Sequence, residues 1–306
     1  LVTWLAMLVS LGAVFYVFDH QRDTHLGNPF PSREERIAMG VLVILVLILV
    51  ARDIAHWRWA GTPDESFFFK AAKEFGEGKL DWFILSGTGV YGYHPVLSTA
   101  YQSLFMKLFG ANVFGWRLSS AVALAVSLPF VYLLVRELWN RRTGYMAAIL
   151  FGTAQLAVGF AHLGYNNVQA YPIVAGSLGI FAWSLRRRSL LGYYLAGCIA
   201  GLGFYTFYPA RLASVLAVLL GLCSGSLPVF RGDRKRTGAF VLAMTLAIFP
   251  LLIDFGGFLA RMTQQAMSPA VEALVGRILS HWFLTIVHGT YYLNPSHFQW
   301  LSLIHI

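Results

Sequence analysis

The sequence predicts an all-α polytopic membrane protein, a bundle of many helices that cross the bilayer. Hydrophobic residues make up 57% of the chain, and charged residues only 12%. Soluble domains carry about a quarter charged residues, so this composition does not suit a surface that faces water. Long apolar runs also recur along the whole chain, and helices satisfy all their backbone groups within the segment when they cross lipid.

The apolar runs set the expected spans in order. They lie at about 1–18, 37–51, 113–138, 143–161, 168–185, 190–207, 209–230 and 237–253, with a further one at about 279–293. The second span is short, but Arg36 and Arg52 flank it and can extend their side chains to the membrane interfaces.

Arginines gather in alternate loops between these spans. They are Arg22 with Arg33 to Arg36, Arg141 with Arg142, Arg186 to Arg188, and Arg231 to Arg236. Cytoplasmic loops carry an excess of Lys and Arg, so these loops are expected in the cytoplasm and loops 52–112 and 162–167 outside the plasma (inner) membrane. The same rule explains the net charge of +9 without a nucleic-acid partner.

The loop at 52–112 is expected to hold two amphipathic helices in the membrane interface. Over 63–77 and 95–109 apolar residues recur at helical spacing, and Gly110 ends the second stretch. Elsewhere, Gly197 and Gly201 form a GxxxG pattern typical of close helix packing. Cys198 and Cys223 lie in expected spans without metal-ligand spacing and are interpreted as packing residues.

An acidic pair opens the first amphipathic stretch, TPDESFFFKAAKEF. Thr62 at the N-cap and Glu65 at the third helical position fit a capping box, and acids in a first turn suit the helix dipole. This explains Glu65 well and Asp64 less specifically. The pair therefore has two interpretations, helix capping or the working carboxylates of an enzyme, and capping leaves Asp64 available for chemistry.

Other polar residues follow on the same expected outer side. His94 opens the second amphipathic stretch, and Arg117 lies at the mouth of a span, where an interfacial side chain that extends to water is the alternative. The loop HLGYNNVQAY presents a cluster of polar residues, which simple solvation would also explain: His162, Asn166, Asn167 and Gln169.

The segment GLGFYTFYPAR breaks two spans at the outer face. Tyr205 and Tyr208 fit an interfacial aromatic belt. Arg211 lies just inside the next span, where an unpaired charge is costly, so we expect it to have a partner such as a lipid phosphate.

The order of these segments resembles a known family. An outward Asp-Glu follows a core span, and then come HPVLSTAYQSLFMKLFG, FGWRLSSAVAL, RELWNRRTGYMAAILF, FAHLGYNNV and AGLGFYTFYPAR. Over about residues 37–230 the chain resembles the GT-C membrane glycosyltransferases of the protein mannosyltransferase and aminoarabinose transferase superfamily.

The resemblance implies an inverting glycosyltransferase whose donor is a polyprenyl-phosphate sugar. Asp64 would be the base that deprotonates an acceptor hydroxyl, with Glu65 as the neighbouring acid, and Arg117 and Arg211 would bind the donor phosphate. The expected substrate-binding residues are His94, His162, Asn166, Asn167, Tyr205 and Tyr208. No metal ligand is assigned, a divalent metal stays open, and the acceptor stays open between protein, lipid and glycan.

The chain departs from the family at Asn166 and Asn167, where relatives often carry an Asp. Any role of that acid in metal or acceptor binding is therefore open for this chain.

A transporter or flippase for lipid-linked saccharides is the alternative function, and it would place ionisable groups near mid-membrane and show repeated halves. The acids concentrate at the outer face and no clear repeat occurs, which favours the enzyme. A structural membrane protein is a third interpretation.

The expected organisation has three parts. Residues 1–36 form an upstream span and a cytoplasmic loop, and 37–300 form the glycosyltransferase module with a truncated C-terminal part. Residues 301–306, LSLIHI, match what a common sequencing adapter would encode, so we expect a non-native tail there.

Overall fold

A computed structural model describes residues 2–22, 31–52, 54–56, 64–80, 85–86, 94–206, 208–223 and 234–253. Side chains at several element ends, among them those of Asp64, His94 and Tyr208, lie outside this description. The chain divides into two units, residues 1–57 with 63–253 and residues 58–62 with 254–306. All described residues belong to the first unit. The expected span near 279–293 and the expected tail at 301–306 lie outside them.

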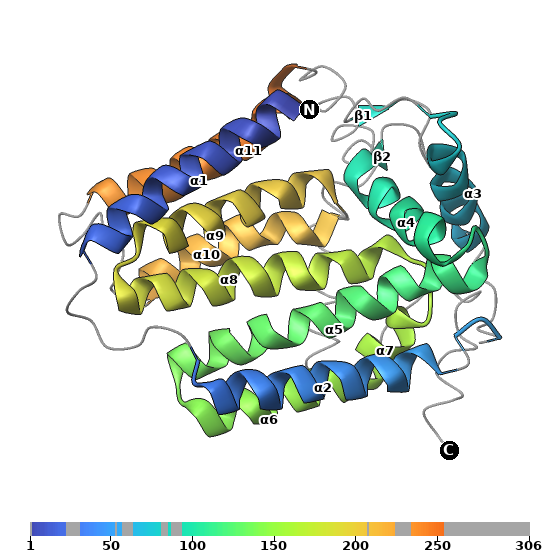
Figure 1. Cartoon of the computed structure of the whole chain (residues 1–306), viewed down its shortest axis with the longest axis horizontal. Helices are drawn as coiled ribbons and strands as arrows, with labels where there is room; N and C mark the ends of the chain where they lie inside the picture. Colours follow the sequence, from blue (N-terminus) through green and yellow to red (C-terminus); the bar gives the residue numbers. More distant parts are fainter. Residues whose placement is uncertain are drawn as a thin grey trace, which may run out of the picture. The chain divides into compact units, whose positions relative to one another are not determined.

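Helices dominate the described residues (Figure 1). They are α1 (Val2–Arg22), α2 (Arg33–Ala51), α3 (Asp64–Gly76), α4 (Val96–Phe109), α5 (Val113–Leu138), α6 (Arg141–Thr153), α7 (Gln155–Ala161), α8 (Ala170–Arg187), α9 (Leu190–Leu202), α10 (Leu212–Cys223) and α11 (Arg234–Ile253), with short 3₁₀ helices η1 (Asn166–Gln169), η2 (Gly203–Tyr205) and η3 (Tyr208–Arg211). Two strands of two residues, β1 (Leu85–Ser86) and β2 (His94–Pro95), pair antiparallel, a ladder that the sequence did not predict.

Local sequence explains where several helices begin. Ser32 caps α2 in a capping box: its Oγ accepts from the backbone N–H of Glu35 at 3.2 Å, and the Glu35 carboxylate accepts from the Ser32 N–H at 2.6 Å. Asn112 caps α5 by accepting from the N–H of Gly115 at 2.9 Å. Such side chains satisfy backbone donors that lack a partner in the first turn.

A helix occupies each of the first eight expected spans, although fewer pass a strict test of length and apolarity. Within the described residues, Val113–Leu138 and Asn166–Arg187 are long and apolar enough to cross a membrane. A third span results if α6 and α7, bent by 53° at a short break, count as one. The sequence therefore located the helices correctly, whereas most of the individual crossings stay predictions.

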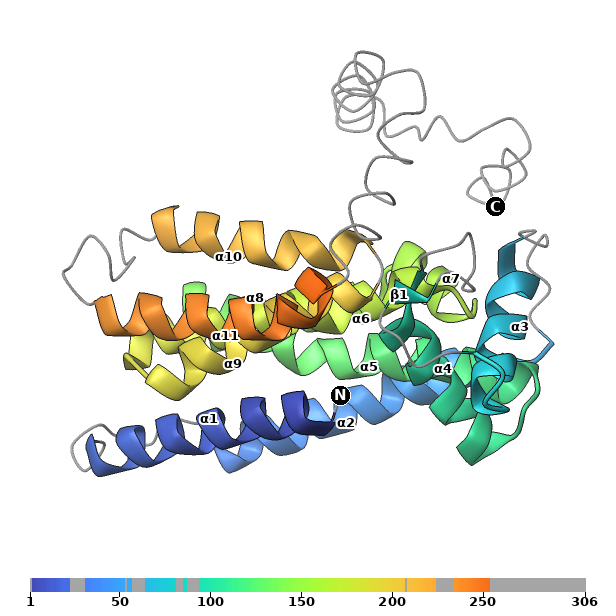
Figure 2. The same cartoon turned by 90° about the horizontal axis from the view of Figure 1, so that it is seen from above.

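Helix α5 is the centre of one half of the bundle. It packs against α2, α6 and α8, while α9 packs against α8, α11 and α1 (Figures 1 and 2). Leu124 and Leu128 of α5 are fully buried in a core that also contains Val50 of α2 and Ala148 of α6. A helix surrounded in this way is expected to lack charges in its middle, and α5 carries no charged residue between Arg117 and Arg136.

The GxxxG pattern in α9 does mark close helix packing. A Cβ atom added to Gly197 would collide with the carbonyl oxygen of Phe240, and one added to Gly201 would lie 2.5 Å from the Cβ of Ala247. Both contacts are with α11. The absence of side chains at these two glycines lets the backbones of α9 and α11 approach each other, so this prediction is confirmed.

The two amphipathic helices present different faces to the bundle. The apolar face of α3 is buried, and Phe68 and Ala72 pack with Met106 and Trp116. In α4 the polar residues Ser98 and Gln102 are buried instead, and Leu104 and Leu108 of the expected apolar face are exposed. Gly110, with φ +102°, follows the end of α4 as expected. An interfacial position of these helices stays a prediction.

Candidate active site

Arg117 and Glu65 form an ion pair between the second turn of α5 and the first turn of α3. Arg117 Nε donates to Glu65 Oε1 at 2.9 Å, and Nη2 lies 2.9 Å from the same oxygen. Nη1 donates to the backbone carbonyl of Ile54 at 3.0 Å. The two side chains are only 9% and 13% exposed. Because little water screens this pair, either charge would be costly to leave without the other.

The segment between α7 and α8 completes this cluster. The backbone N–H of Gly164 donates to Glu65 Oε1 at 3.5 Å, and its carbonyl accepts from Gln102 Nε2 at 2.6 Å. No side chain fits at Gly164, because a Cβ there would collide with the ring of Trp116. Gly164 therefore joins α3, α4 and α5, three helices that precede it by many residues.

His162 lies at the end of α7 and is 4% exposed. Its Nδ1 lies 2.8 Å from the carbonyl oxygen of Val158. Burial lowers the pKa of His162 below its usual value, the positive charge of Arg117 lowers it further, and the contact with Val158 opposes these effects in part. The neutral imidazole is therefore favoured at neutral pH.

Asn166 and Asn167 lie in η1 rather than in a solvated loop. Asn166 is fully buried, and the Oδ1 atom of Asn167 is buried without a hydrogen-bond donor among the described residues. Simple solvation, the alternative considered for this loop, is therefore wrong for His162 and Asn166. A buried amide oxygen without a donor is a place where a hydroxyl group could bind, so substrate binding by this segment stays a prediction.

Tyr205 and Arg211 lie in the short helices η2 and η3. Tyr205 is 3% exposed, and its hydroxyl donates to the carbonyl of Ala247 at 2.8 Å. The structure therefore gives Tyr205 a packing role in the core. The guanidinium of Arg211 is partly buried, 5.8 Å from the ring centre of Phe204. Helix η3 packs against η1, so Arg211 belongs to the same region as the two asparagines.

Three expected site residues are described by their backbone alone. Asp64 is the first residue of α3, next to the anchored Glu65. His94 belongs to β2, and Tyr208 is the first residue of η3. Thr62, the N-cap of the expected capping box, lies outside the described residues.

One buried amide side chain near the site, Gln102, was missed from the sequence, and Gln169 of the predicted polar cluster is buried next to Ser98. Ser98 Oγ donates to Gln169 Oε1 at 2.9 Å, and Gln169 Nε2 donates to the Ser98 carbonyl at 3.2 Å. Gln102, one turn after Ser98, binds Gly164. The repeat of polar residues at positions 98 and 102 was the available signal, because an amphipathic helix presents residues four apart on one face.

Within the described part of the chain, no three His, Cys, Asp or Glu side chains lie close enough together to hold a metal ion.

The sequence matches a protein-family model described as dolichyl-phosphate-mannose-protein mannosyltransferase. The match covers residues 93–253, which is just over half of the chain and includes Arg117 and the segment from His162 to Arg211. The chain belongs to this family. The family relationship agrees with the resemblance found in the sequence.

Curated relatives of this mannosyltransferase-family chain include bacterial arabinosyl transferases. The undecaprenyl phosphate-α-4-amino-4-deoxy-L-arabinose arabinosyl transferase of Pseudomonas aeruginosa is 34% identical over 199 residues, 62% of this chain and 35% of the relative. The enzyme of the same name from Yersinia enterocolitica is 24% identical over 220 residues, 69% of this chain and 39% of the relative. The chain thus spans little more than a third of the length of these relatives.

Solved structures of an archaeal oligosaccharyltransferase from Archaeoglobus fulgidus have a similar fold. The apo form has a TM-score of 0.50 at 14% identity, covering 88% of this chain and 39% of the other. A complex with an inhibitory peptide and a dolichol-phosphate has a TM-score of 0.51 at 12% identity, covering 90% and 39%. At these identities the likeness concerns the fold alone, the all-α GT-C-type bundle that the sequence predicted.

Proposed function

We propose that this protein transfers a sugar from a polyprenyl-phosphate donor to an acceptor hydroxyl, with inversion, on the extracytoplasmic side of the membrane. The contact of Glu65 with both Arg117 and Gly164 carries the proposal, because it gathers the acidic start of α3, the start of α5 and the segment before α8. The undecaprenyl-phosphate sugar in the names of the curated relatives supports the donor class.

Asp64 is the base in this proposal, and Glu65 and Arg117 are positioning residues. The ion pair anchors Glu65, and the backbone connects Glu65 directly to Asp64. An anchored first turn holds the backbone of Asp64 in place, which favours catalysis by a preorganised base. Arg211 is the candidate that faces the donor phosphate, a role that a partly buried guanidinium suits.

The chemistry needs no general acid. Asp64 takes the proton of the acceptor hydroxyl as its oxygen bonds to the anomeric carbon of the sugar. The bond from that carbon to the phosphate oxygen breaks on the opposite face, and the polyprenyl phosphate leaves with the bonding electrons. A phosphate is a good leaving group, and a nearby guanidinium stabilises its growing charge. The displacement inverts the anomeric configuration.

Transfer from a labelled polyprenyl-phosphate sugar tests the proposal in membranes that contain the full-length protein. Removing a general base costs about 100-fold or more in rate, so Asp64→Asn should lose nearly all transfer. The matched control is Glu74→Gln, which changes a carboxylate on the same helix. Glu74 Oε1 lies 3.8 Å from the Nζ atom of Lys70, whose side chain is exposed. This control should keep the wild-type rate.

Two results would contradict the proposal. Unchanged transfer by Asp64→Asn would remove Asp64 as the base. Movement of the labelled lipid across the membrane without transfer to any acceptor would favour the transporter instead.

A further inference from the structure

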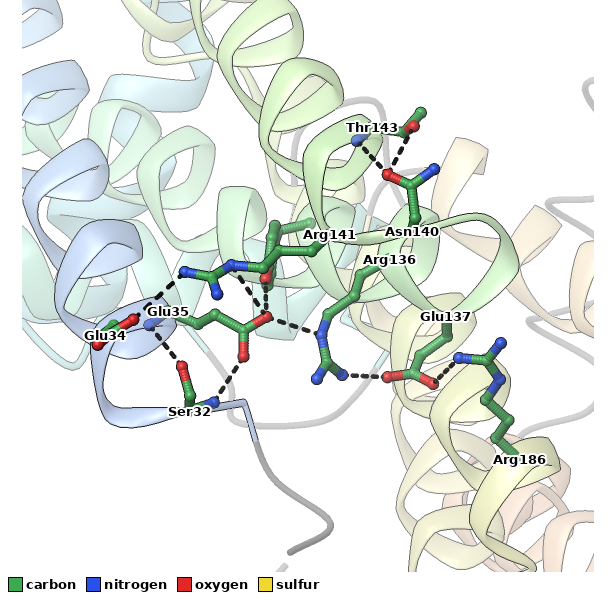
Figure 3. A network of polar contacts seen from close by, with 10 residues as sticks. Ser32, Glu34, Glu35, Arg136, Glu137, Asn140, Arg141, Thr143 and Arg186 are labelled. Atoms are coloured by element: carbon green, nitrogen blue, oxygen red, sulfur yellow. Dashed lines mark hydrogen bonds and ion pairs between the residues drawn. The ribbon is translucent and has the colours of Figure 1, made fainter.

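A second group of charged side chains lies at the other end of α5. Figure 3 shows Glu35 from α2, Arg136 and Glu137 from the last turn of α5, Arg141 from α6 and Arg186 from α8. We call this group the arginine cluster. Arg136 follows Arg117 by 19 positions on α5, about 28 Å along a straight helix. The hydrocarbon core of a bilayer is about 30 Å thick, so this separation suits two polar layers on opposite sides of a membrane.

The interior of the arginine cluster is fixed by buried contacts. Arg136 Nε donates to Glu35 Oε1 at 3.0 Å, and Arg136 Nη1 also pairs with the Glu137 carboxylate. The hydroxyl of Tyr132 donates to Glu35, and the Ser32 N–H donates to the other Glu35 oxygen. Glu35 and Glu137 are 4% and 6% exposed. Arg136 therefore lies between two buried carboxylates.

The outer arginines of the cluster are held less closely by carboxylates. The side chains of Arg141 and Arg186 are 52% and 62% exposed. Arg141 lies 3.8 Å from both Glu34 and Glu35 and over the ring of Tyr145, and Arg186 Nη1 lies 3.6 Å from Glu137. These distances are too long for hydrogen bonds, so both guanidinium groups can turn toward a ligand without breaking one to a carboxylate.

These side chains surround a cavity of about 430 Å³, lined by Glu35, Arg136, Glu137, Trp139, Asn140, Arg141, Arg186 and Arg187. The volume falls within the range of about 300–1,000 Å³ that is usual for small-ligand sites. Four arginines and two glutamates give the lining a formal charge of +2. The cavity therefore favours an anion, and guanidinium groups bind phosphate well.

One exposed apolar side chain lines the cavity, and others follow along α6. Trp139, in its lining, is 65% exposed. Beyond Arg141, the same helix exposes Met146 and Leu150, which are 62% and 66% exposed. A free phosphate ion would leave this apolar surface uncovered, whereas a phospholipid could place its phosphate among the arginines and an acyl chain along α6.

We propose that the cavity of the arginine cluster binds the phosphate headgroup of an anionic membrane phospholipid. Arg141, Arg186 and Arg187 contact the phosphate, and the acyl chains lie along the exposed side of α6. The buried ion pairs of Arg136 keep the floor of the site in place. This site lies at the opposite end of α5 from the candidate active site and does not depend on the proposed transfer reaction.

Native mass spectrometry of the full chain in detergent, titrated with dioctanoyl phosphatidylglycerol, tests the proposal. The variants are Arg141→Gln and Arg187→Gln. Their matched controls are Arg142→Gln and Arg188→Gln, which change exposed neighbours outside the cavity lining. Each cavity arginine should contribute about fivefold to phosphatidylglycerol affinity, the usual value for a basic residue near an anionic lipid. The controls should bind like the wild type.

Three comparisons make the result decisive. Dioctanoyl phosphatidylcholine should bind more weakly than phosphatidylglycerol, and Arg141→Lys, which keeps the charge, should recover part of the affinity that Arg141→Gln loses. Equal losses in the cavity variants and their controls would overturn the site. Displacement of the lipid by equimolar inorganic phosphate would overturn the lipid as its occupant.

Discussion

Arg117 and Glu65 lie 52 positions apart in the sequence, yet two guanidinium nitrogens of Arg117 lie within 2.9 Å of one Glu65 oxygen. The same oxygen accepts from the N–H of Gly164, almost a hundred positions after Glu65. One carboxylate therefore joins three segments of the chain. Asp64, the proposed base, immediately precedes Glu65 in α3, so this pair anchors the turn that carries it.

The Glu65–Arg117 pair should couple strongly in a double-mutant cycle. Removing one partner of a nearly buried ion pair leaves an uncompensated charge, so Arg117→Ala and Glu65→Ala should each lower the free energy of unfolding by about 3 kcal/mol. The double variant should lose clearly less than the sum of the two. Reversible unfolding in mixed detergent micelles measures the three values.

The control for this cycle is Lys70 with Glu74, one turn apart on α3, whose side chains are 73% and 34% exposed. Its coupling should be below about 0.5 kcal/mol. Similar coupling energies for the two pairs would contradict the anchoring role of Glu65 and Arg117.

Gly197→Ala should separate α9 from α11. The added methyl group would collide with the Phe240 carbonyl, and such overpacking usually costs about 1–3 kcal/mol. Gly40→Ala in α2 is the matched control, because nothing lies within 4 Å of a Cβ there. In a helix interior that change should stabilise the protein by up to about 1 kcal/mol. Thermal unfolding in detergent compares the variants, and equal midpoints would contradict the close contact.

Glu35 should make stability depend on pH in the acid range. Burial alone would raise the pKa of Glu35, but hydrogen bonds from Tyr132 and Ser32 and the charge of Arg136 lower it from 4.5 to about 2. A lowered pKa stabilises the folded state above pH 4.5, and this contribution falls as the pH drops from about 4.5 to about 2. Its full size is about 3 kcal/mol.

Thermal unfolding of the wild type and of Glu35→Gln between pH 6 and pH 2 measures this contribution. The difference between the two proteins should shrink as the pH falls through that window. A difference that stays constant with pH would contradict the lowered pKa.

His162 should act in a different pH range. Its pKa is lowered by burial and by Arg117, so the unfolded chain takes up a proton near pH 6.5 before the folded protein does. The contribution of His162 to the free energy of unfolding is therefore complete above pH 6.5 and falls as the solution becomes more acidic. His162→Gln should flatten the decrease in melting midpoint between pH 7.5 and pH 5.5, and an unchanged decrease would argue against the buried neutral histidine.

Local pattern accounts for much of what the sequence predicted correctly. The predicted span at 113–138 coincides with α5, and Gly110 follows the end of α4 as expected. Apolar periodicity and helix-ending residues act within a few turns of chain, so they are visible without the rest of the fold. The GxxxG pattern of α9 succeeded for the same reason, because two glycines one turn apart make a surface that only a close neighbour fills.

Long-range packing decided the remaining features. The sequence treated Arg117 as a phosphate ligand or an interfacial side chain, whereas the structure pairs it with Glu65 and Ile54. Solvation in an outer loop was one interpretation of His162 and Asn166, whereas both side chains are buried in the structure. No local pattern encodes these outcomes, because each depends on which helices meet.

The sequence by itself therefore determined the helices, their order, the family and the place of Asp64 at the start of α3. The tertiary structure alone decided that α4 turns its polar side inward, that Glu65 joins three segments, and that Arg136 lies between two buried carboxylates. The physical reason is range: helix formation follows from neighbours along the chain, whereas an ion pair needs two distant side chains to be brought together and shielded from water.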